Sequence, residues 1–349
     1  MAFQSAANYG NLPNGVFSPT IYSKKVQKQF RRTAVAEDIT NNDYFGEISN
    51  MGDSVKIIKE PEITVTPYAR GTQLTPQDLE DSDFYLIVDR ANSFIFRIDD
   101  IEKMQSHVNW MDLASDRAAH QMSMVYDRDI LGYLSGYEYN ETTGIWTART
   151  APVGSKSESS ADDDELLGVH KLTGSAFGGS ASNSISMGVD GTKDATPLQI
   201  LNRFNRLLDQ QNVPSDGRFV VLDPVFVEKL MDENSKFINN DYMANQNAGG
   251  QLTNGKLVQS KIRGFEIYQS NNLPVIGTGP GTVGAGNSSN YGVILAGHKG
   301  SAATAQQLSK TESFRDPSSF GDVVRGMHVY GRKILKPQGL LRAWYNVNA

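Results

Sequence analysis

The stretch IDDIEKMQSHVNWMDLASDRAAHQMSMVYDRDILGYLSG, residues 98–136, contains the clearest periodicity of the sequence. Apolar and small side chains recur there at alternating spacings of three and four, which predicts one buried stripe along a helix. The stripe comprises Ile98, Ile101, Met104, Val108, Met111, Ser115, Ala118, Met122 and Val125. Asp99 and Asp100 predict its start, because acidic residues favour a helix N-terminus. Gly132 and Gly136 predict its end, so about 35 residues at ~1.5 Å each give a helix about 50 Å long.

The face opposite this stripe is predicted to be polar. It carries Glu102, Lys103, Asp116, Arg117, Asp127 and Arg128. A helix with one apolar side needs another element to bury that side. Ser115 at the centre of the stripe argues against a coiled coil, so we expect a spine helix packed on a sheet or on shorter helices.

Upstream of the helix, residues 54–98 predict two long strands joined by a polar tip. The first arm contains SVKII (54–58) and ITV (63–65), and the second contains FYLIVD (84–89) and FIFRI (94–98). Each arm of about 15–20 residues at ~3.3 Å spans roughly 50–65 Å, which is longer than one domain core. An isolated two-stranded ribbon is only marginally stable in water. We therefore expect other copies of the chain to support it.

The N-terminal residues divide into two parts. Residues 1–20 are rich in Gly, Asn, Pro and Ser and predict an extended arm. Residues 22–36 contain five basic residues and no acidic one. On a helix, four of the basic residues would form one stripe: Lys24, Lys28, Arg31 and Arg32. Two interpretations stay open, a solvated helix face and a surface that docks onto an acidic partner or nucleic acid.

The C-terminal half predicts a mixed lobe of helices and strands. Residues 136–196 are rich in Gly, Ser, Thr and Asp and predict loops or short strands. Thr196, Pro197 and Gln199 predict a capping box at a helix start. Asp223 with the proline after it predicts a second helix start. Further strands are predicted at 218–223, 255–274, 291–297, 321–335 and 340–347.

The composition excludes several classes of protein. The 349 residues include 33 Lys and Arg and 39 Asp and Glu, a formal net charge of −6, which argues against a chain that wraps nucleic acid. Cysteine is absent, so disulfides, thiolate metal sites and cysteine nucleophiles are excluded. No apolar run approaches ~20 residues and no secretory signal is visible, so we expect a protein made in the cytoplasm.

Four motifs with possible chemistry do not survive inspection. Residues 279–284 match GxGxxG but lack the strand before and the helix after that phosphate binding requires. Residues 250–256 match GxxxxGK, but Leu257 stands where Ser or Thr would hold magnesium, which indicates a turn. The acidic run 162–165 lacks the spacing of a calcium loop. The five histidines form no metal-binding pair, so we expect no cofactor, no metal and no catalytic site.

The order of parts resembles the major capsid proteins of tailed bacteriophages, which have the Hong Kong 97-type fold, a mixed α+β fold. The stretches that carry the resemblance are GDSVKIIKEPEITVTPYARGTQLTPQDLEDSD (52–83), FIFRIDDIEKMQS (94–106), VPSDGRFVVLDPVFVEKLM (213–231), KIRGFEIYQSNNLP (261–274) and residues 291–340. Together they cover most of the chain from about residue 40. Their order and spacing, rather than one strict motif, carry the comparison.

The resemblance implies a division of the chain into four parts. Residues 1–43 would be an N-terminal arm and 44–98 an extended hairpin loop. Residues 99–217 and 316–349 would form a peripheral domain with the spine helix, and 218–315 an axial domain. Some relatives carry a scaffolding segment ahead of the arm, so a chain that starts near the arm implies a separate scaffolding protein or none.

The resemblance also implies a function. The chain would not be an enzyme; it would assemble with itself, as hexamers and pentamers, into the icosahedral capsid of a virion that encloses double-stranded DNA. Implied partners are a scaffolding protein, a portal at one vertex, possible decoration proteins, and packaged DNA through weak non-specific contacts, with synthesis in the host bacterial cytoplasm and no membrane. The residues expected at assembly interfaces are Lys24, Lys28, Arg31, Arg32, Glu60, Arg70, Asp78, Glu80 and Asp83.

Two alternatives stay open at this point. An encapsulin-like compartment would have the same fold but would enclose cargo enzymes instead of a genome. A nucleotide-dependent enzyme would use the loop 250–256, and ATP binding by the purified chain would distinguish it.

Overall fold

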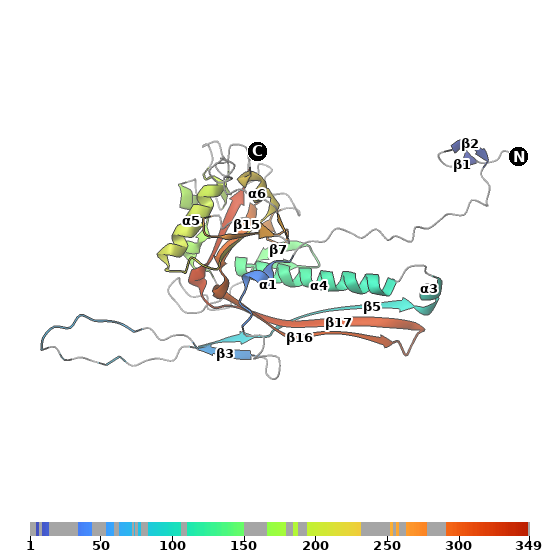
Figure 1. The fold of residues 1–349 in the computed structure, drawn as a ribbon, viewed down its shortest axis with the longest axis horizontal. Helices are drawn as coiled ribbons and strands as arrows, with labels where there is room; N and C mark the ends of the chain where they lie inside the picture. The colour runs from blue at the N-terminus through green and yellow to red at the C-terminus, as the bar shows by residue number, and fades with distance from the viewer. Residues whose placement is uncertain are drawn as a thin grey trace.

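The computed structural model describes most of the chain, and its helices and strands are interspersed along the sequence (Figure 1). The described residues are 5–6, 9–13, 34–43, 54–58, 63–71, 73, 76–77, 83–105, 110–149, 166–178, 184–187, 194–231, 252–253, 256–257, 263–277 and 291–347. The helices are α1 (Ala36–Ile39), α3 (Asp100–Gln105), α4 (Trp110–Ser135), α5 (Pro197–Gln210) and α6 (Pro224–Leu230). Short 3-10 turns are η1 (Gly168–His170), η2 (Gly174–Phe177), η3 (Lys299–Ser301) and η4 (Pro337–Gly339). The expected mixture of helix and sheet is confirmed.

The largest sheet has nine strands and forms the centre of the core. Its main path is β11 (Leu252–Thr253), β12 (Lys256–Leu257), β13 (Glu266–Gln269), β10 (Arg218–Leu222), β15 (Tyr291–His298), β18 (Leu340–Asn346) and β8 (Lys171–Leu172). Beside this path, β14 (Val275–Ile276) pairs with β15 and β9 (Ile185–Ser186) pairs with β18. Every residue of β10 is buried, because helices cover both faces of the sheet.

Alternate residues of β10 face two different layers. Val220 and Leu222 pack in one apolar cluster with Phe204 of α5. Phe219 and Val221 pack on the other face, in the cluster that contains the buried residues of α1 and α4. Because successive side chains of a strand point to opposite faces, this one short strand contributes to both apolar clusters.

The caps predicted for α5 and α6 are confirmed. The Thr196 hydroxyl accepts the backbone N–H of Gln199, whose side chain accepts the N–H of Thr196, a complete capping box. The Asp223 carboxylate accepts the N–H of Phe226 at 3.1 Å, and Pro224 occupies the first turn. Local sequence therefore determines where both helices begin.

The predicted start at Asp99–Asp100 and the predicted stop at Gly136 agree with the structure to within one residue, whereas the predicted stop at Gly132 does not. Ile98 and Asp99 belong to a strand, and the helical residues begin at Asp100 with α3. At the other end, Gly132 lies inside α4, and Gly136, with φ +78°, follows its last residue. A left-handed backbone suits glycine, which explains the stop there. Gly132 has another role: its bare Cα lets the ring of Trp146 lie close to the helix.

The burial of the spine helix is concentrated in its C-terminal half. There the buried residues of α4 include Tyr126, Ile130, Leu131 and Leu134, which pack on α1 and the nine-stranded sheet. Asp127 was predicted on the polar face but is completely buried. It lies among these residues because a second layer, the segment that contains α1, covers that side of the helix.

A second sheet of three long strands runs beneath the spine helix (Figure 1). Its order is β16 (Ala302–Arg315), β17 (Gly321–Ile334) and β5 (Arg90–Asp99). The segment FIFRI, predicted in the lone ribbon, belongs to β5 and pairs with β17, with Phe96 opposite Val324. This pairing places alternate residues of β5 under α4, where their apolar side is partly covered. The strand β16 was not predicted, because AATAQQLSKTESFR lacks regular apolar alternation.

Three hairpins complete the described structure. β3 (Ser54–Ile58) pairs antiparallel with β4 (Asp83–Ile87), which confirms a ribbon but with short arms. β6 (Tyr137–Asn140) pairs with β7 (Ile145–Ala148) beside the end of α4. β1 (Ser5–Ala6) pairs with β2 (Tyr9–Pro13), and Figure 1 shows this pair apart from the other elements.

The strand pairing joins segments that the expected domain division assigns to different parts. The limit at 315 falls at the end of β16 and separates it from β17, although the two strands pair along their whole length. β18, assigned to the peripheral part, lies in the nine-stranded sheet beside β15. In addition, residues 35–41 of the predicted arm are packed into the body, with Ile39 completely buried. Sequence order could not reveal these pairings, which join distant segments.

The described part of the chain gives two further results. None of its helices is long and apolar enough to cross a membrane. Within the segment 250–256, which was predicted to be a turn, β11 and β12 pair antiparallel with Thr253 opposite Lys256, and Lys256–Leu257 form a strand rather than the start of a helix. The runs at 162–165 and 279–284 lie outside the described residues.

Candidate functional site

One apolar surface lies on the ribbon formed by β3 and β4. On one face of the ribbon, Leu86 is completely buried against alanines at the start of β16. The other face exposes Ile58, Tyr85 and Ile87, at 69%, 51% and 52%. Because successive residues of a strand point to opposite faces, apolar residues on both faces require two covering surfaces. The described residues supply only one of them.

The segment 63–70 continues this surface away from the body (Figure 1). All eight of its residues are exposed, and Val65 is 91% exposed. Ile63 and Tyr68 are also exposed, at 68% and 65%. The N–H of Thr64 donates to the Gln77 side chain at 3.0 Å, which ties the segment to the returning chain. An apolar cluster of this kind on a protein surface is typical of an interaction site.

A second apolar surface lies at the opposite side of the molecule, around α3 (Figure 1). Its members are Ile101, Met104, Trp110 and Phe320, exposed at 65%, 87%, 51% and 79%. The backbone N–H of Asp100 donates to the carbonyl of Phe320 at 3.0 Å, which brings the turn after β16 against α3. Ile101 and Met104 were predicted to be buried, but the spine loses its cover at this end.

Ion pairs fix the shape of this second surface. Lys103 lies 2.7 Å from Asp322, and Arg97 lies 3.4 Å from Asp316. Arg315 contacts Asp100. Hydrogen bonds from Ser318 and Ser319, together with Arg97, lower the pKa of Asp316, and the hydrogen bond from Lys103 lowers the pKa of Asp322. Because the pairs join α3 to the β16–β17 turn, they hold the apolar residues in one arrangement.

The face of the three-stranded sheet opposite α4 carries a shallow groove of about 560 Å³. Its lining includes the apolar residues Ile95 and Met327. Three charged residues lie beside them: Lys310, Glu312 and Arg325. Hydrogen bonds from Lys310 and Arg325 lower the pKa of Glu312 to about 2. The groove therefore combines apolar contact area with charges that are already paired, which suits packing rather than catalysis.

Two of the nine predicted interface residues lie in the described structure. Arg70 is exposed in the projecting segment. Asp83 begins β4 opposite Ile58. The other seven lie outside the described residues: Lys24, Lys28, Arg31, Arg32, Glu60, Asp78 and Glu80.

The sequence interpretation concentrated on charged residues and missed the apolar ones. Ile57 and Ile58 are consecutive, so one of them must face away from the body. Tyr85 and Ile87 alternate with Phe84 and Leu86, which makes β4 apolar on both faces. That pattern was the available signal for a strand covered from two sides.

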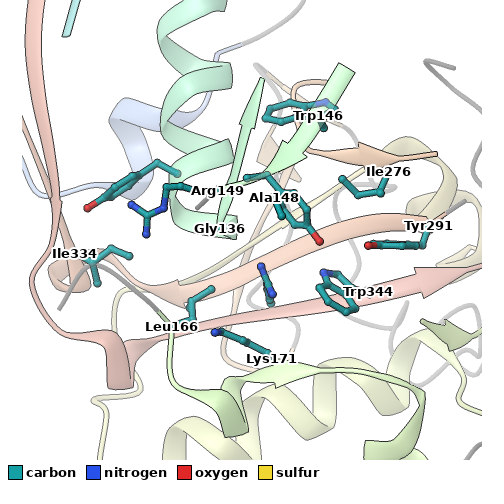
Figure 2. Close-up of a pocket in the computed structure, with 13 residues that line it drawn as sticks. Gly136, Trp146, Ala148, Arg149, Leu166, Lys171, Ile276, Tyr291, Ile334 and Trp344 are labelled. Atoms are coloured by element: carbon teal, nitrogen blue, oxygen red, sulfur yellow. The ribbon is translucent and has the colours of Figure 1, made fainter. Parts of the chain in front are cut away.

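The cavity beside the β6–β7 hairpin has a volume of about 280 Å³ (Figure 2). Figure 2 shows the rings of Trp146, Tyr291 and Trp344 around it, with Arg149 and Lys171 at its rim. Burial raises the pKa of Tyr137 in its wall. The described lining contains no carboxylate, serine, threonine or histidine that could act as nucleophile or general base. Among the described residues, no group of three or more His, Asp or Glu is placed to hold a metal ion.

The comparisons with known proteins agree with this architecture. The family described as phage capsid protein matches residues 93–343. A solved chain of Mycobacterium phage Che8 is 22% identical, with 94% of this chain and 97% of that chain covered and a TM-score of 0.63. The capsid of Ralstonia phage GP4 is 12% identical, with 99% of both chains covered and a TM-score of 0.64. No curated protein matches the chain.

The fold similarity extends over almost the whole chain. The capsid structure of the cyanophage P-SCSP1u is 18% identical, covers 98% of this chain and 97% of that chain, and gives a TM-score of 0.61. At such low identities, the similarity to these solved structures shows the fold alone. The family match spans more than half of the sequence and shows the family. The chain therefore belongs to the phage capsid protein family.

Proposed function

We propose that this phage capsid protein is the major subunit of the shell, and that its copies assemble as hexamers and pentamers into an icosahedral capsid around double-stranded DNA. The observation that carries the proposal is the pair of apolar surfaces on opposite sides of one body. Burying such surfaces against neighbouring copies removes apolar area from water. A closed shell repeats the same contacts at every subunit, so one chain can supply both sides of each interface.

The strand pairing supports a revised division of labour within the subunit. The nine-stranded sheet with α5 and α6 would form the axial part, at the centre of each hexamer or pentamer. The spine helix α4 with the three-stranded sheet would form the peripheral part. Residues 1–34 would be the N-terminal arm, and residues 44–89 the extended loop. This division keeps both strands of the β16–β17 hairpin in the peripheral part. The chain enters this hairpin from β15, which belongs to the axial part.

Partners beyond the chain itself are proposed from chemistry and from the family. The basic stripe Lys24, Lys28, Arg31 and Arg32 suits an acidic scaffolding protein or neighbour. A portal at one vertex and a decoration protein belong to the family resemblance. The net charge of −6 supports only weak, non-specific contact with packaged DNA. The protein would be made in the host cytoplasm and would end in the virion.

The proposed role is structural and not enzymatic. The aromatic and cationic cavity in Figure 2 has no carboxylate, serine, threonine or histidine among its described lining, so no acid–base or nucleophile pair built from these groups is present there. Equilibrium dialysis against ATP tests the nucleotide alternative, and retention of ATP by the purified chain would contradict the structural role.

An encapsulin-like compartment is the second candidate, and it rests on the same fold. Such a shell would retain a specific cargo protein through purification. Mass spectrometry of shells purified from the native cells distinguishes the two, because a phage capsid should contain no stoichiometric cargo enzyme.

The first experiment compares two matched substitutions. Ile87 on the ribbon and Ile145 on the β6–β7 hairpin are exposed to nearly the same extent, 52% and 54%. Ile87→Ser should reduce the yield of closed shells at least about tenfold, because each shell repeats the lost contact many times. Ile145→Ser should leave the yield within about twofold. Negative-stain electron microscopy and sedimentation measure both, and equal yields from the two variants would contradict the proposed interface.

A further inference from the structure

Asp127 is a buried carboxylate that the predicted polar face of the spine helix does not explain. Its side chain is completely buried, although an ionisable group is costly to remove from water. It lies in the C-terminal half of α4, at the meeting point of three segments: the spine, the segment that contains α1, and the turn before β14. A buried carboxylate is tolerated when hydrogen-bond donors of the protein replace the water that it has lost.

The hydrogen bonds of Asp127 join all three segments. One carboxylate oxygen, Oδ1, accepts the backbone N–H groups of Val35 and Ala36, each at 2.7 Å. The other oxygen, Oδ2, accepts Nδ2 of Asn272 at 2.6 Å. Burial raises the pKa of Asp127, while these donors act in the opposite direction. Without the carboxylate, two buried backbone donors would lose their acceptor, which is an expensive change.

The same segment is held again a few residues later. The N–H of Asn41 donates to the carbonyl of Ala302 at 2.8 Å, and the N–H of Thr304 donates to the carbonyl of Asn41 at 3.0 Å. The Thr40 and Thr304 hydroxyls lie 3.1 Å apart. Between the two attachments, Ile39 is completely buried. Residues 35–41 are therefore fixed at one end by Asp127 and at the other by the start of β16.

We infer that Asp127 is a positioning residue for assembly, because it fixes the point at which the N-terminal residues leave the body. The part of this inference that concerns shells rests on the proposed function, whereas the attachment of Val35 and Ala36 does not. Asp127 is completely buried within its own subunit, so it acts by anchoring the segment that follows the basic stripe.

The test uses limited digestion of the full chain with trypsin. The protease needs several extended residues on both sides of the cut, so cleavage after Arg32 requires residues 33–36 to detach, whereas cleavage after Lys24 does not. Asp127→Leu keeps the side-chain shape but removes both acceptor oxygens. It should raise the ratio of cleavage after Arg32 to cleavage after Lys24 about tenfold.

Two variants control the comparison. Asp127→Asn retains one oxygen for the two backbone donors, and the Asn272 amide can reverse to accept from it, so the ratio should stay within about twofold of the unmodified protein. Asp38→Leu makes the same change on the exposed side of α1 and should also leave the ratio unchanged. An unchanged ratio in Asp127→Leu overturns the inference, as does an equal rise in Asp38→Leu.

Hydrogen exchange of the unmodified protein gives a test that does not depend on a folded variant. The first N–H groups of a helix normally exchange quickly, because they have no partner within the helix. Bonded to Asp127, the amides of Val35 and Ala36 should exchange at least about a hundredfold more slowly than in an unfolded chain. Exchange of these two amides at the unfolded rate overturns the inference.

Shell yield then separates the anchoring from its consequence. Asp127→Leu should lower the yield of shells, and Asp127→Asn should restore it. Normal yield from Asp127→Leu, together with faster cleavage after Arg32, overturns the role in assembly and leaves the anchor. If the unmodified chain forms no shells, the proposed function fails, and the cleavage ratio still decides the anchoring.

Discussion

At the scale of single residues, buried charges hold the loops of the core in place. Arg218 begins β10 and is only 2% exposed. Its Nε donates to the Pro214 carbonyl at 2.9 Å, and one terminal nitrogen donates to the Val213 carbonyl at 2.5 Å and to Asp209 at 2.7 Å. A planar guanidinium has several fixed donors, which lets one side chain close the whole loop after α5.

Arg218→Met should destabilise the subunit by about 2–4 kcal/mol, because the carbonyls of Val213 and Pro214 would lose a buried donor. Asp209→Asn should cost less than about 1 kcal/mol, because the Asp209 side chain is 58% exposed. Denaturant unfolding of the dissociated subunit measures both. Equal losses in the two variants would contradict this account of Arg218.

Two buried histidines predict a dependence of stability on pH. Burial lowers the pKa of His170 and of His328 from the ordinary value of 6.5. Below about pH 6.5 these histidines bind protons in the unfolded chain but stay neutral in the folded chain. The free energy of unfolding therefore falls as the pH falls. The slope reaches up to about 1.4 kcal/mol per pH unit for each histidine. Above about pH 7.5 these groups contribute no slope.

Denaturant unfolding between pH 8 and pH 5.5 measures this slope, and a histidine variant assigns it. The carbonyl of Leu340 lies 3.0 Å from Nδ1 of His170, and the amide of an asparagine could donate there instead. His170→Asn should therefore fold and should lose part of the slope. Asp127 acts in the opposite sense, since a raised pKa gives stability at low pH that declines as the pH rises. An unchanged slope in His170→Asn would show that this histidine does not contribute.

At the scale of elements, close approaches decide how the spine helix and the hairpins fit together. Gly132 lies inside α4, where glycine is less favourable than alanine. A Cβ on this residue would lie 2.6 Å from the Trp146 ring and 2.9 Å from the Tyr137 carbonyl. The same device recurs in the three-stranded sheet, where a Cβ on Gly326 would overlap the ring of Phe94. In both places a missing side chain lets an aromatic ring cover the backbone.

Gly132→Ala should destabilise the subunit by about 1–3 kcal/mol, although alanine favours a helix, because the β6–β7 hairpin must move outward. Trp146→Leu in the same chain should recover part of the loss by making room for the new methyl group. Ser123→Ala, on an exposed position of the same helix, is the matched control and should be neutral or slightly stabilising. Thermal unfolding of these three variants, of Trp146→Leu alone and of the unmodified protein checks the prediction, and additive losses in the double variant would contradict it.

At the scale of the whole molecule, the chain places two uncovered apolar surfaces at opposite sides of a well-packed centre (Figure 1). The centre buries its own apolar residues, because helices cover both faces of the nine-stranded sheet. The surfaces at the ribbon and at α3 need partners. This separation allows a subunit to fold first and to bury its remaining apolar area on assembly.

Removal of the projecting loop should separate folding from assembly. Ile58 and Asp83 are partners in the ribbon, so Asn-Gly can replace residues 59–82 as a two-residue hairpin turn. The variant should keep the circular dichroism and unfolding temperature of the unmodified subunit and should form no closed shells. Electron microscopy and sedimentation check this outcome. Shells of normal number and size would contradict a role of the loop in assembly.

Much of the fold could be predicted from local patterns. The caps of α5 and α6, the buried strand β10 and the C-terminal half of the spine follow from short-range rules. The long strand β16 could not be predicted, because its polar sequence becomes a strand only through pairing with β17. For the site, the charged residues of the loop correctly indicated the ribbon. The exposed residues that the structure describes there are largely apolar, and the sequence analysis did not name them.

The sequence by itself determined most of the elements, because caps, periodicity and turn residues act over a few positions. It also determined the order of parts, and with it the resemblance to phage capsid proteins. Only the tertiary structure decided that Asp127 is buried, that β5 pairs with β17, and which apolar residues stay exposed. These depend on contacts between residues more than 90 positions apart, such as Val35 and Asp127, and no local pattern encodes which distant segments will meet.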